Sequence, residues 1–495
     1  MLILYEDDDL LVVNKPSGIN THKPDRFAPD GIHEWLAKRR PRLSILQRLD
    51  KDTSGVLLFG KTERANQSLA RQFESHSIRK EYLLLTTTRP SRGKCRARTA
   101  NAITEFELMQ PHGRFFLVAA RPVTGKTHQI RRHAAENGFP ILGDTEYGGE
   151  PAPRLMLHSH ALTFELPRTA ETLRLVAAVP ESFDEVNALV AAKEFRDTIF
   201  DERTDAFRLV SGAADGFPDV IIDDYAGRLL VQWQTEGAKQ RHAALVDELR
   251  ERCQPRAIYE QLGTKQKRSP PACVCGTPAA ERFAVRENDL TFLAGFHEGL
   301  SAGVFLDQRE NRWRLRGMDL AGRTLLNCFS YTCGFSVAAA KAGAVTASVD
   351  LSKNYLAWGA ANFRANGLDP GAHAFVSGDV FGWLKRFQKR QQRWDLVILD
   401  PPTFSTTKSG HAFQAMRDYQ QLEEQALQVV APGGTLFCST NQRTFRADEF
   451  EAMLHAAAKR CGRVIASLEF ETVPFDFRVA EGERPYLKMV WACLE

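Results

Sequence analysis

The sequence predicts a multidomain protein that combines two fold classes, α+β toward the N-terminus and α/β toward the C-terminus. With 495 residues the chain is long enough for about three domains. Residues 1–180 contain mostly short apolar runs between turns, which is typical of a mixed α+β domain. Residues 190–296 predict a small α+β domain. Residues 297–495 alternate strands with helices, and this alternation predicts a Rossmann-like, doubly wound parallel sheet.

A polar loop at residues 47–55 marks the centre of the first domain. The apolar runs on either side of it, residues 43–46 and 56–59, are too short for helices and predict buried strands. A loop held between two buried strands would place Asp50 at the floor of a cleft. An ordinary turn with a solvated Asp50 is the simpler alternative, because Asp, Thr, Ser and Gly are common turn residues. Helical segments are predicted at residues 65–73, 129–137 and 181–194.

Apolar patterns locate the elements of the other two domains. In the middle domain the predicted elements are strands at residues 207–210, 220–222, 229–231 and 290–293, a helix at 238–253 and an exposed loop or hairpin tip at 263–280. In the third domain the predicted strands are residues 324–326, 345–349, 374–376, 395–399, 435–438 and 486–493, with helices at 336–342 and 355–366. Ligands of such a sheet bind at the carboxyl ends of its strands, so we expect the binding residues at those ends.

Polar residues follow the first four strands of the third domain. The turn from Asn327 to Gly334 follows the first strand, and Asp350, Asp379 and Asp400 end the next three. Each aspartate alone is more simply a helix N-cap or a turn residue, but four successive strand ends in one sheet favour a binding site. Asp350 stands 23 positions after Asn327, where an acidic residue can bind ribose hydroxyls. The turn has no Gly-x-Gly-x-x-Gly motif, which argues against a nicotinamide site.

Charge and cysteine content limit the class of protein. The net charge is +4, but basic residues gather locally, as at Lys385, Arg386, Lys389, Arg390 and Arg393. Such clusters suit a polyanion such as RNA, although a solvated basic face is the commoner explanation for a single cluster. The nine cysteines lack zinc-site spacing, which predicts reduced thiols and no metal. The acidic N-terminus is unlike a signal peptide and no apolar run approaches the ~20 residues of a membrane span, so we expect a cytoplasmic protein without a membrane partner.

Several motifs occur in a fixed order within the first 170 residues. They are Leu11 to Gly18, the loop Arg48-Leu49-Asp50 with Thr53-Ser54-Gly55, Lys80-Glu81-Tyr82, Thr124 to Arg131, and Gly143-Asp144. This series resembles the RluA-type pseudouridine synthases, which isomerise uridine to pseudouridine in RNA. The resemblance implies a pseudouridine synthase domain that uses neither a metal nor an organic cofactor.

The same resemblance assigns three catalytic residues. Asp50 would be the nucleophile, and Tyr82 would stack on the target base and transfer a proton. Arg131 would pair with Asp50 and keep it ionised, since a neighbouring guanidinium favours the charged form of a carboxyl group. Gln47 departs from the family, which usually has histidine at that position.

Residues 305–309, 326–332 and 400–402 form a second ordered set of motifs, with Phe404 and Lys408 behind the last. The set resembles class I S-adenosylmethionine-dependent methyltransferases, in particular the RlmI and RlmK group that acts on 23S rRNA. The resemblance implies S-adenosylmethionine as the cofactor. The residues it assigns to cofactor binding are Asp307, Gln308, Arg309, Phe329, Ser330, Tyr331, Gly334, Asp350 (ribose) and Asp379 (adenine amine). The residues it places against the flipped target base are Asp400, Pro401, Pro402 and Phe404.

The segment after the fifth strand bears on the target base. Methylation at cytosine C5 needs a cysteine thiolate, and the candidate is Cys438, which lies in a predicted buried strand where inert thiols are common. The cytosine enzymes have their cysteine where this chain has Asn441, and residues 439–446 resemble the guanine-N7 enzymes instead. Guanine N7 has its own lone pair and needs only orientation. We therefore expect a bifunctional rRNA-modifying enzyme that isomerises uridine and methylates guanine N7. The alternatives are cytosine C5 methylation and a synthase domain that only binds RNA.

Overall fold

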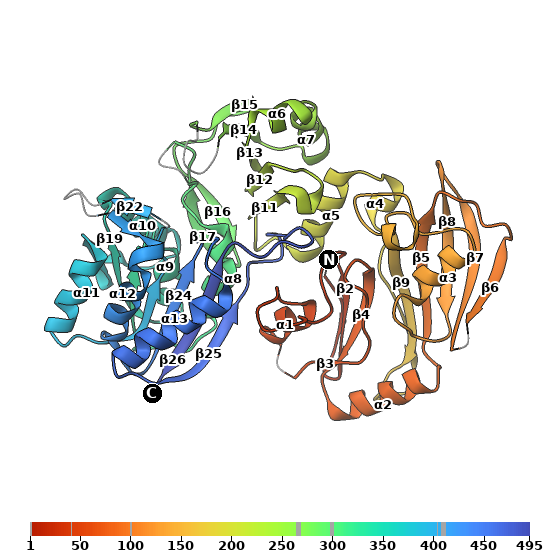
Figure 1. Ribbon diagram of the computed structural model, residues 1–495, viewed down its shortest axis with the longest axis horizontal. Coiled ribbons are helices and arrows are strands. Elements are labelled where there is room, and N and C mark those ends of the chain that lie inside the picture. Colours follow the sequence, from red (N-terminus) through yellow and green to blue (C-terminus); the bar gives the residue numbers. More distant parts are fainter. Residues whose placement is uncertain are drawn as a thin grey trace. The chain divides into compact units, whose positions relative to one another are not determined.

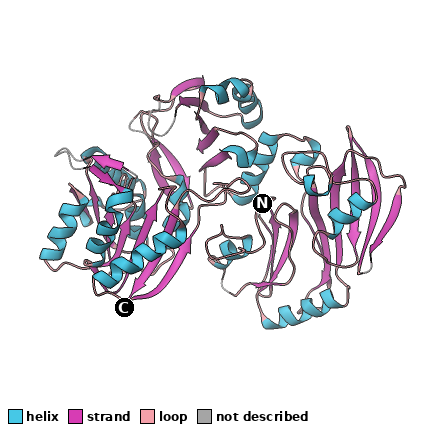
Figure 2. Cartoon of the chain, in the orientation of Figure 1, coloured by secondary structure: helices cyan, strands magenta, loops and turns pink. Residues whose placement is uncertain are grey.

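The computed structural model describes residues 2–40, 42–99, 101–263, 269–297, 301–402, 404–406 and 412–495. They form two compact units: residues 1–202 with 215–218, and residues 203–214 with 219–495 (Figure 1). The predicted fold class is confirmed, because each unit combines helices with sheets (Figure 2). The boundary between a middle and a third domain near residue 296 remains a prediction.

The first unit is built on a ten-stranded sheet. Its strands run in the order β1-β2-β4-β9-β5-β8-β7-β6, with β3 paired to β4 and β10 paired to β9. The strands are β1 (Ile3–Glu6), β2 (Leu10–Lys15), β3 (Ser44–Ile45), β4 (Ser54–Gly60), β5 (Arg79–Thr86), β6 (Lys94–Thr99), β7 (Ala102–His112), β8 (Phe115–Pro122), β9 (Leu157–Glu165) and β10 (Thr172–Val176). The two strands that flank the polar loop, β3 and β4, pair antiparallel, so the loop that carries Asp50 is held at the sheet.

Helices pack on this sheet through apolar residues. Val12 and Val56 of the neighbouring strands β2 and β4 pack with Ala65 of α2, and Val118 of β8 packs with Ile130 of α3. The helices are α1 (Ile32–Ala37), α2 (Glu63–Glu74), α3 (Gln129–Glu136), η1 (Thr145–Tyr147), α4 (Glu181–Asp184) and α5 (Ala188–Ile199). The helical segment predicted at residues 181–194 is two helices, because the side chain of Asn187 accepts backbone N–H groups and caps a new helix.

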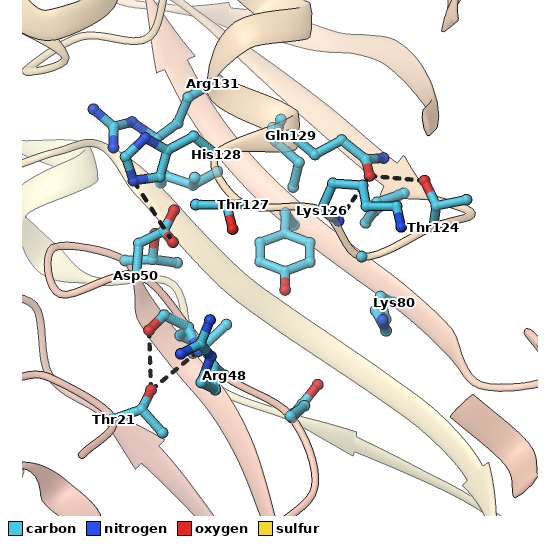
Figure 3. Close-up of a pocket in the computed structure, with 18 of the residues that line it drawn as sticks. Thr21, Arg48, Asp50, Lys80, Thr124, Lys126, Thr127, His128, Gln129 and Arg131 are labelled. Carbon is cyan, nitrogen blue, oxygen red and sulfur yellow. Dashed lines mark hydrogen bonds and ion pairs between the residues drawn. The ribbon is translucent and has the colours of Figure 1, made fainter. Parts of the chain in front are cut away.

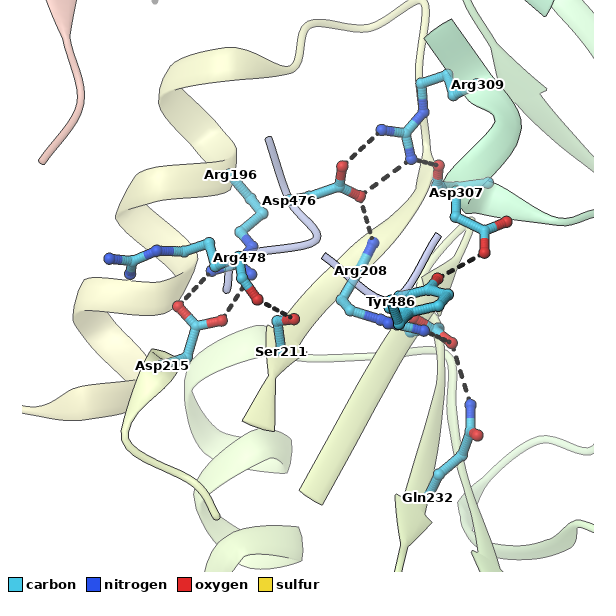
Figure 4. Close-up of polar contacts among 12 residues, drawn as sticks. Arg196, Arg208, Ser211, Asp215, Gln232, Asp307, Arg309, Asp476, Arg478 and Tyr486 are labelled. Atoms are coloured by element: carbon cyan, nitrogen blue, oxygen red, sulfur yellow. Dashed lines mark hydrogen bonds and ion pairs between the residues drawn. The ribbon is translucent and has the colours of Figure 1, made fainter. Parts of the chain in front are cut away.

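Residues 215–218 belong to the first unit although their neighbours in the chain belong to the second. The carboxylate of Asp215 accepts two hydrogen bonds from the guanidinium of Arg196, at 2.8 and 2.7 Å (Figure 4). Both side chains are fully buried. This buried ion pair ties the returning segment to α5.

The second unit begins with two small sheets. A five-stranded sheet contains β11 (Ala206–Ser211), β12 (Val220–Tyr225), β13 (Arg228–Trp233), β14 (Ala257–Leu262) and β15 (Ala272–Gly276) in that order, and β16 (Phe283–Glu287) pairs with β17 (Leu290–Ala294). The helix predicted at residues 238–253 is divided into α6 (Glu236–Arg241) and α7 (Leu245–Cys253). A short 3-10 turn, η2 (Gly212–Asp215), follows β11.

A seven-stranded sheet forms the rest of the second unit. Its order is β20-β19-β18-β21-β24-β26-β25, with strands β18 (Thr324–Cys328), β19 (Val345–Asp350), β20 (Ala374–Ser377), β21 (Trp394–Leu399), β24 (Val430–Thr440), β25 (Ile465–Glu471) and β26 (Lys488–Leu494). The first five strands are parallel, but β26 is antiparallel to both of its neighbours. The prediction of a wholly parallel sheet is therefore wrong at this edge, where β25 and β26 are joined without the crossover helix that parallel pairing needs.

Helices cover both faces of this sheet. Residues of α9 and α10 pack in one buried cluster, and residues of α11, α12 and α13 pack in a second. The helices are η3 (Leu306–Gln308), α8 (Arg309–Arg316), α9 (Gly334–Lys341), α10 (Lys353–Ala365), η4 (Pro370–Ala372), α11 (Val380–Lys389), α12 (Ala415–Leu427) and α13 (Ala447–Arg460). The short strands β22 (Phe404–Thr406) and β23 (Ala412–Gln414) pair antiparallel. The strand order reverses at β18, which places a binding crevice at the carboxyl ends of β18, β19 and β21.

Candidate active sites

Asp50 lies in the loop between β3 and β4, and polar side chains hold this loop on both sides. Thr21 Oγ1 accepts the N–H of Leu49 at 3.1 Å and donates to the Leu49 carbonyl at 2.9 Å. The fully buried ammonium of Lys15 donates to the carbonyl of Lys51 at 2.9 Å. The backbone is thus fixed immediately before and after Asp50, as expected of a site rather than of a solvated turn.

The loop forms part of the wall of a cavity of about 820 Å³ (Figure 3). Asp50 is the only carboxylate among the described residues that line it. The lysines and arginines of the lining are Arg48, Lys51, Lys80, Lys126 and Arg131. This excess of positive charge favours an anionic ligand such as an RNA backbone.

Tyr82, the second predicted catalytic residue, lines the same cavity from β5. Burial, with a smaller contribution from the carboxylate of Asp50, raises the pKa of the Tyr82 phenol to about 12. The phenol is therefore neutral at physiological pH and can donate or accept one hydrogen bond. The structure brings Asp50 and Tyr82 to one cavity, as a shared chemical role requires.

Arg131, on α3, reaches the cavity but pairs with other carboxylates. Its guanidinium donates to both oxygens of Asp144 at 2.7 and 2.6 Å and to Glu146 at 2.8 Å. The prediction that Arg131 pairs with Asp50 is therefore wrong for this structure. The physical reason is that the side chain of Asp144 is fully buried, and a buried carboxylate depends on its cation more than a half-exposed one does.

His128 is the residue that faces Asp50 instead, and it was not among the predicted catalytic residues. Its Nε2 lies 3.9 Å from Asp50 Oδ1 (Figure 3), and its Nδ1 lies 3.1 Å from the hydroxyl of Tyr147. His128 has a φ of 52°, a left-handed conformation that is strained for a residue other than glycine and is typical of functional sites. Its place in the motif before Gln129 was the only signal in the sequence.

Ser54, at the start of β4, joins a buried polar network behind the loop. Its hydroxyl lies 2.8 Å from His158 Nδ1 and accepts a hydrogen bond from Arg154, which also donates to Glu194 at 2.6 Å. Burial, with the charge of Arg154, lowers the pKa of His158 to about 3. Gly55 follows with a φ of 110°, and a Cβ there would lie 2.2 Å from a carbonyl oxygen of β9, so only glycine fits.

In the second unit, the predicted cofactor loop follows β18. Phe329, Tyr331 and Cys333 have φ values of 58°, 48° and 63°. Three left-handed residues within five positions are costly, and such strain is typical of ligand-binding loops. Ser330 is buried and donates its N–H to β19 at 3.0 Å, and Gly334 begins α9 behind the loop. The four residues predicted to line the methionine end of the cofactor therefore lie on one tightly folded turn.

Asp350 ends β19 beside this turn. Its two carboxylate oxygens accept the backbone N–H groups of Tyr331 at 2.9 Å and Ser352 at 2.8 Å. Burial raises the pKa of Asp350. The carboxylate thus connects the ends of β18 and β19 and has a fixed orientation, which suits hydrogen bonds to the hydroxyls of a ribose.

Asp379 follows β20 and caps α11. Its Oδ2 accepts the N–H of Gly382 at 2.8 Å, which is the N-cap role common for an aspartate before a helix. Both this role and cofactor binding were expected alternatives for Asp379. The contact of Asp379 with an adenine amine remains a prediction.

Asp400 follows β21 and connects two of the predicted motifs. Its Oδ1 accepts hydrogen bonds from Gln308 Nε2 at 3.1 Å and from the hydroxyl of Ser439. Burial raises the pKa of Asp400 to about 6. Pro401 is buried and Pro402 is exposed. Ser439 is a second residue that the sequence analysis did not assign, although it follows Cys438 at the end of the predicted strand.

Two motif residues fall outside the described side chains. Phe404 begins β22, but the structure does not describe its side chain, and Lys408 lies outside the described residues. Cys438 is well described: it is fully buried in β24, and burial raises the pKa of its thiol far above the usual range. A thiol in this state is a poor source of thiolate.

Asp307 and Arg309 belong to a polar network inside the second unit (Figure 4). The buried guanidinium of Arg309 donates to both oxygens of Asp476 at 2.8 and 3.1 Å, and the hydroxyl of Tyr486 donates to Asp307 at 2.5 Å. The structure thus uses Arg309 to hold Asp476. Direct contacts of Asp307 and Arg309 with a cofactor remain predictions.

The nine cysteines are free thiols. Across the described ranges, no group of three or more His, Cys, Asp or Glu side chains is arranged to hold a metal ion. Within those ranges, too, every helix is too short or too polar to cross a membrane.

Comparisons with known proteins match the two sites separately. Residues 9–136 match the family model described as RNA pseudouridylate synthase, and residues 208–475 match the family model described as S-adenosylmethionine-dependent methyltransferase. The first match contains Asp50, Tyr82 and Arg131, and the second contains Asp350 and Asp400.

Two relatives with curated descriptions and one solved structure are described as methyltransferases. YwbD of Bacillus subtilis, described as a candidate ribosomal RNA large subunit methyltransferase, is 36% identical over 313 residues, which are 62% of this chain and 79% of that protein. Ribosomal RNA large subunit methyltransferase I of Serratia proteamaculans is 33% identical over 292 residues, 57% of this chain and 73% of that protein. The crystal structure of SMU.776, a candidate methyltransferase in complex with SAH, has a TM-score of 0.57 and 29% identity, and covers 67% of this chain and 87% of its own.

Proposed function

The chain belongs to the S-adenosylmethionine-dependent methyltransferase family and carries a pseudouridylate synthase domain, and we propose that it modifies the ribosomal RNA of the large subunit with both activities. The two enzyme classes and the cofactor predicted from the sequence are confirmed by the family matches. The first activity isomerises uridine in the cavity around Asp50. The second transfers a methyl group to N7 of a guanine. We place the protein in the cytoplasm, where its substrate is made.

The observation that supports the isomerase activity is the cavity around Asp50. Among the described residues that line it, Asp50 is the only carboxylate, and five are lysine or arginine. The carboxylate of Asp50 bonds to the nucleoside as the bond between N1 and C1′ breaks, and the uracil turns. A bond then forms between C5 and C1′ as the bond to Asp50 breaks and frees the carboxylate. C5 loses its proton and N1 gains one, so the product is an isomer of uridine. Tyr82, whose neutral phenol lines the same cavity, transfers this proton: its oxygen takes the proton from C5 as its own hydroxyl proton passes to water, and the phenol stays neutral. His128 lies 3.9 Å from Asp50, and when protonated it stabilises the attacking carboxylate.

The methyltransferase proposal assigns the cofactor to the carboxyl ends of β18, β19 and β20. Asp350 binds the ribose hydroxyls, and the turn with Phe329, Ser330, Tyr331 and Gly334 holds the methionine part. The fit rests on the fixed orientation of the Asp350 carboxylate, both of whose oxygens are aligned by backbone N–H groups. S-adenosylmethionine supplies an electrophilic methyl group when bound. Asp400, with Pro401 and Pro402, orients the target base beside it.

Guanine N7 is preferred to cytosine C5 because of Cys438. A cytosine C5 enzyme needs a thiolate that can reach the base, whereas Cys438 is fully buried and its pKa lies far above neutral. Guanine N7 attacks the methyl group with its own lone pair, so the protein needs only to hold the base in place. The residues that remain at the strand ends, Asp400 and Ser439, are hydrogen-bonding groups suited to that task.

Mapping both modifications in a strain that lacks this protein tests the proposal. Pseudouridines in 23S rRNA are located by carbodiimide treatment and primer extension, and 7-methylguanosine is measured by mass spectrometry of the nucleosides. We expect at least one pseudouridine and one 7-methylguanosine to disappear, and both to return with the wild-type gene. Asp50→Ala should restore only the methyl group, and Asp350→Ala only the pseudouridine. An unchanged pseudouridine profile would reduce the first domain to an RNA-binding module.

Cys438→Ala separates the two target bases. If guanine N7 is the target, the variant methylates at the wild-type rate, because the thiol takes no part. A variant that folds and binds S-adenosylmethionine normally but transfers no methyl group would identify Cys438 as a nucleophile and cytosine as the base. Val490→Ala, which shortens a buried side chain paired with Cys438 across β24 and β26, controls for a packing defect in the same place.

A further inference from the structure

The end of α11 carries an isolated group of cations that neither proposed active site uses. Between Val380 and Trp394 the chain has five basic residues and no acidic one. The five side chains, here called the α11 basic patch, are Lys385, Arg386, Lys389, Arg390 and Arg393, and all are exposed. The buried residues of the same helix, Val380, Leu384 and Phe387, fasten its opposite face to the sheet. The patch is therefore a fixed outward surface.

The cations of the α11 basic patch lack carboxylate partners. Of the five, none forms an ion pair with any residue in the described part of the chain. Other exposed arginines of this unit do find partners: Arg417 pairs with Asp418, Arg446 with Asp448, and Arg460 with Glu424. The patch thus differs from an ordinary charged surface, where both signs are interspersed.

The arrangement also places like charges close together. Lys385 and Lys389, and likewise Arg386 and Arg390, stand four positions apart, a spacing at which equal charges destabilise a helix. Arg463, which follows α13 and is anchored to main-chain carbonyls, approaches from outside the helix: burial and then the charge of Arg393 lower the pKa of its guanidinium. Cations at a helix C-terminus favour the helix dipole, but one or two suffice for that purpose. The excess indicates a polyanionic partner.

The position of the patch separates it from the proposed methyl-transfer site. Asp379 caps the N-terminus of α11 at the carboxyl edge of the sheet, which is the edge assigned to the cofactor. A helix of this length is about 15 Å long, so its C-terminal end points to the opposite edge of the sheet. Figure 1 shows α11 beside α12 on the outside of this unit. A ligand on the patch therefore lies away from the reacting base.

We propose that the α11 basic patch docks the phosphate backbone of the RNA substrate at a distance from the target base. The inference rests on the proposed function only in taking RNA as the substrate. Lysine and arginine at this spacing bind phosphates without reading sequence, and their contribution falls as salt rises because bound counterions are released. Arg386, whose guanidinium lies 4.7 Å from the centre of the Trp383 ring, is held in place for such a contact. The patch thereby raises affinity and fixes orientation but leaves the chemical step unchanged.

The test compares two triple variants of the full chain that lose equal charge. The patch variant is Lys389→Ala, Arg390→Ala and Arg393→Ala. The control variant is Arg241→Ala, Arg250→Ala and Arg286→Ala, three exposed arginines of the same unit that pair with aspartates. Binding to a protein-free 23S rRNA transcript is measured over a range of salt concentrations, together with methyl transfer to that transcript and calorimetric binding of S-adenosylmethionine.

We expect the patch variant to bind the transcript at least about tenfold more weakly at low salt, with a salt dependence less steep by about 2 to 3 in the logarithmic plot. Its KM for RNA should rise while kcat and S-adenosylmethionine affinity stay at the wild-type value. The control variant should stay within about twofold of wild type. Equal salt dependence in the patch and control variants overturns the inference, as does a fall in kcat alone. If the wild-type protein does not methylate the transcript, that result contradicts the proposed function and not the inference about the patch. The comparison of RNA binding between the two variants still tests the patch in that case.

Discussion

His158 gives the first unit a dependence of stability on pH that can be worked out from its surroundings. The imidazole is 1% exposed, and burial with the charge of Arg154 lowers its pKa to about 3. In the unfolded chain its pKa returns to the ordinary 6.5. Between these values the unfolded state binds a proton that the folded state does not. The contribution of the neutral His158 to the free energy of unfolding is therefore fully present above about pH 6.5, and it is lost as the pH falls toward 3.

The size of this effect follows from the two pKa values. The fall from 6.5 to about 3 amounts to about 5 kcal/mol at a pH below both values, because one pKa unit is about 1.4 kcal/mol. Between about pH 7.5 and about pH 5 the free energy of unfolding should decrease by only part of this amount, about 2 kcal/mol. The network of Ser54, His158 and Arg154 lies directly behind the loop with Asp50. The decrease in stability should therefore affect β4 and β9, the strands that carry this network.

Hydrogen exchange measured by mass spectrometry resolves this unit from the rest of the chain. Opening free energies of amides in β4 and β9 are compared at about pH 7.5 and about pH 5, after correction for intrinsic exchange. We expect a decrease of about 2 kcal/mol in the wild type and a much smaller one in His158→Gln, whose amide does not titrate. His112→Gln, at a more exposed site of the same unit, should keep the wild-type decrease. A wild type without the decrease, or a His158→Gln variant that retains all of it, refutes the reasoning.

Other changes act on single groups. Asp50→Ala should lower pseudouridine formation by at least about 10⁴-fold, because the variant lacks the nucleophile. The assay measures the tritium released from 5-tritiated uridine in RNA. A parallel loss of S-adenosylmethionine binding would contradict the independence of the two sites. Asp350→Ala should weaken S-adenosylmethionine about 10- to 100-fold by calorimetry, since hydrogen bonds to a charged group contribute about 1.5–3 kcal/mol, and an unchanged Kd removes Asp350 from the cofactor site. The rate of methyl transfer should rise as the pH increases through about 6, where Asp400 ionises. A wild-type pH profile without that step would show that Asp400 does not act as a carboxylate. Glu423 is buried, its carboxyl oxygens have no hydrogen-bond partner among the described residues, and its pKa is raised well above 4.5. The folded state therefore loses stability as the pH rises above 4.5, where the unfolded chain releases this proton. Glu423→Gln should raise the free energy of unfolding at pH 8 more than at pH 4, by about 1–2 kcal/mol in denaturant titrations, and the reverse order would show that the acid is not neutral when folded.

The strand ends of the second unit were predictable because they depend on local patterns. A short apolar run followed by a polar residue gives a buried strand and its end, and this rule located Asp350 and Asp400. The same rule missed strands whose buried and exposed residues alternate: in β16 every other residue is exposed, and polar residues flank it in the sequence. The antiparallel β26 could not be distinguished from a parallel strand, because direction is set by the connection and not by the strand's own residues.

The partners of charged side chains were not predictable in the same way. Arg131 was expected to meet Asp50, but Asp144 and Glu146, 13 and 15 positions later, are closer in the fold. Arg309 pairs with Asp476, 167 positions away. Which of several carboxylates a guanidinium meets depends on differences of a few ångströms between folded segments, and a motif carries no such information. His128 was overlooked for the related reason that its unusual φ is a property of the folded turn.

The short return of residues 215–218 to the first unit has a practical meaning for anyone who wishes to study the two activities apart. A fragment that stops at residue 202 lacks Asp215 and so deprives the buried Arg196 of the carboxylate that it meets at 2.7 Å, a loss that typically costs about 3–5 kcal/mol when one member of a buried pair is removed. A fragment that continues to residue 218 keeps that pair but takes β11 away from its sheet. No single cut separates the enzymes cleanly, so gene fission in evolution would have to repair one half or the other.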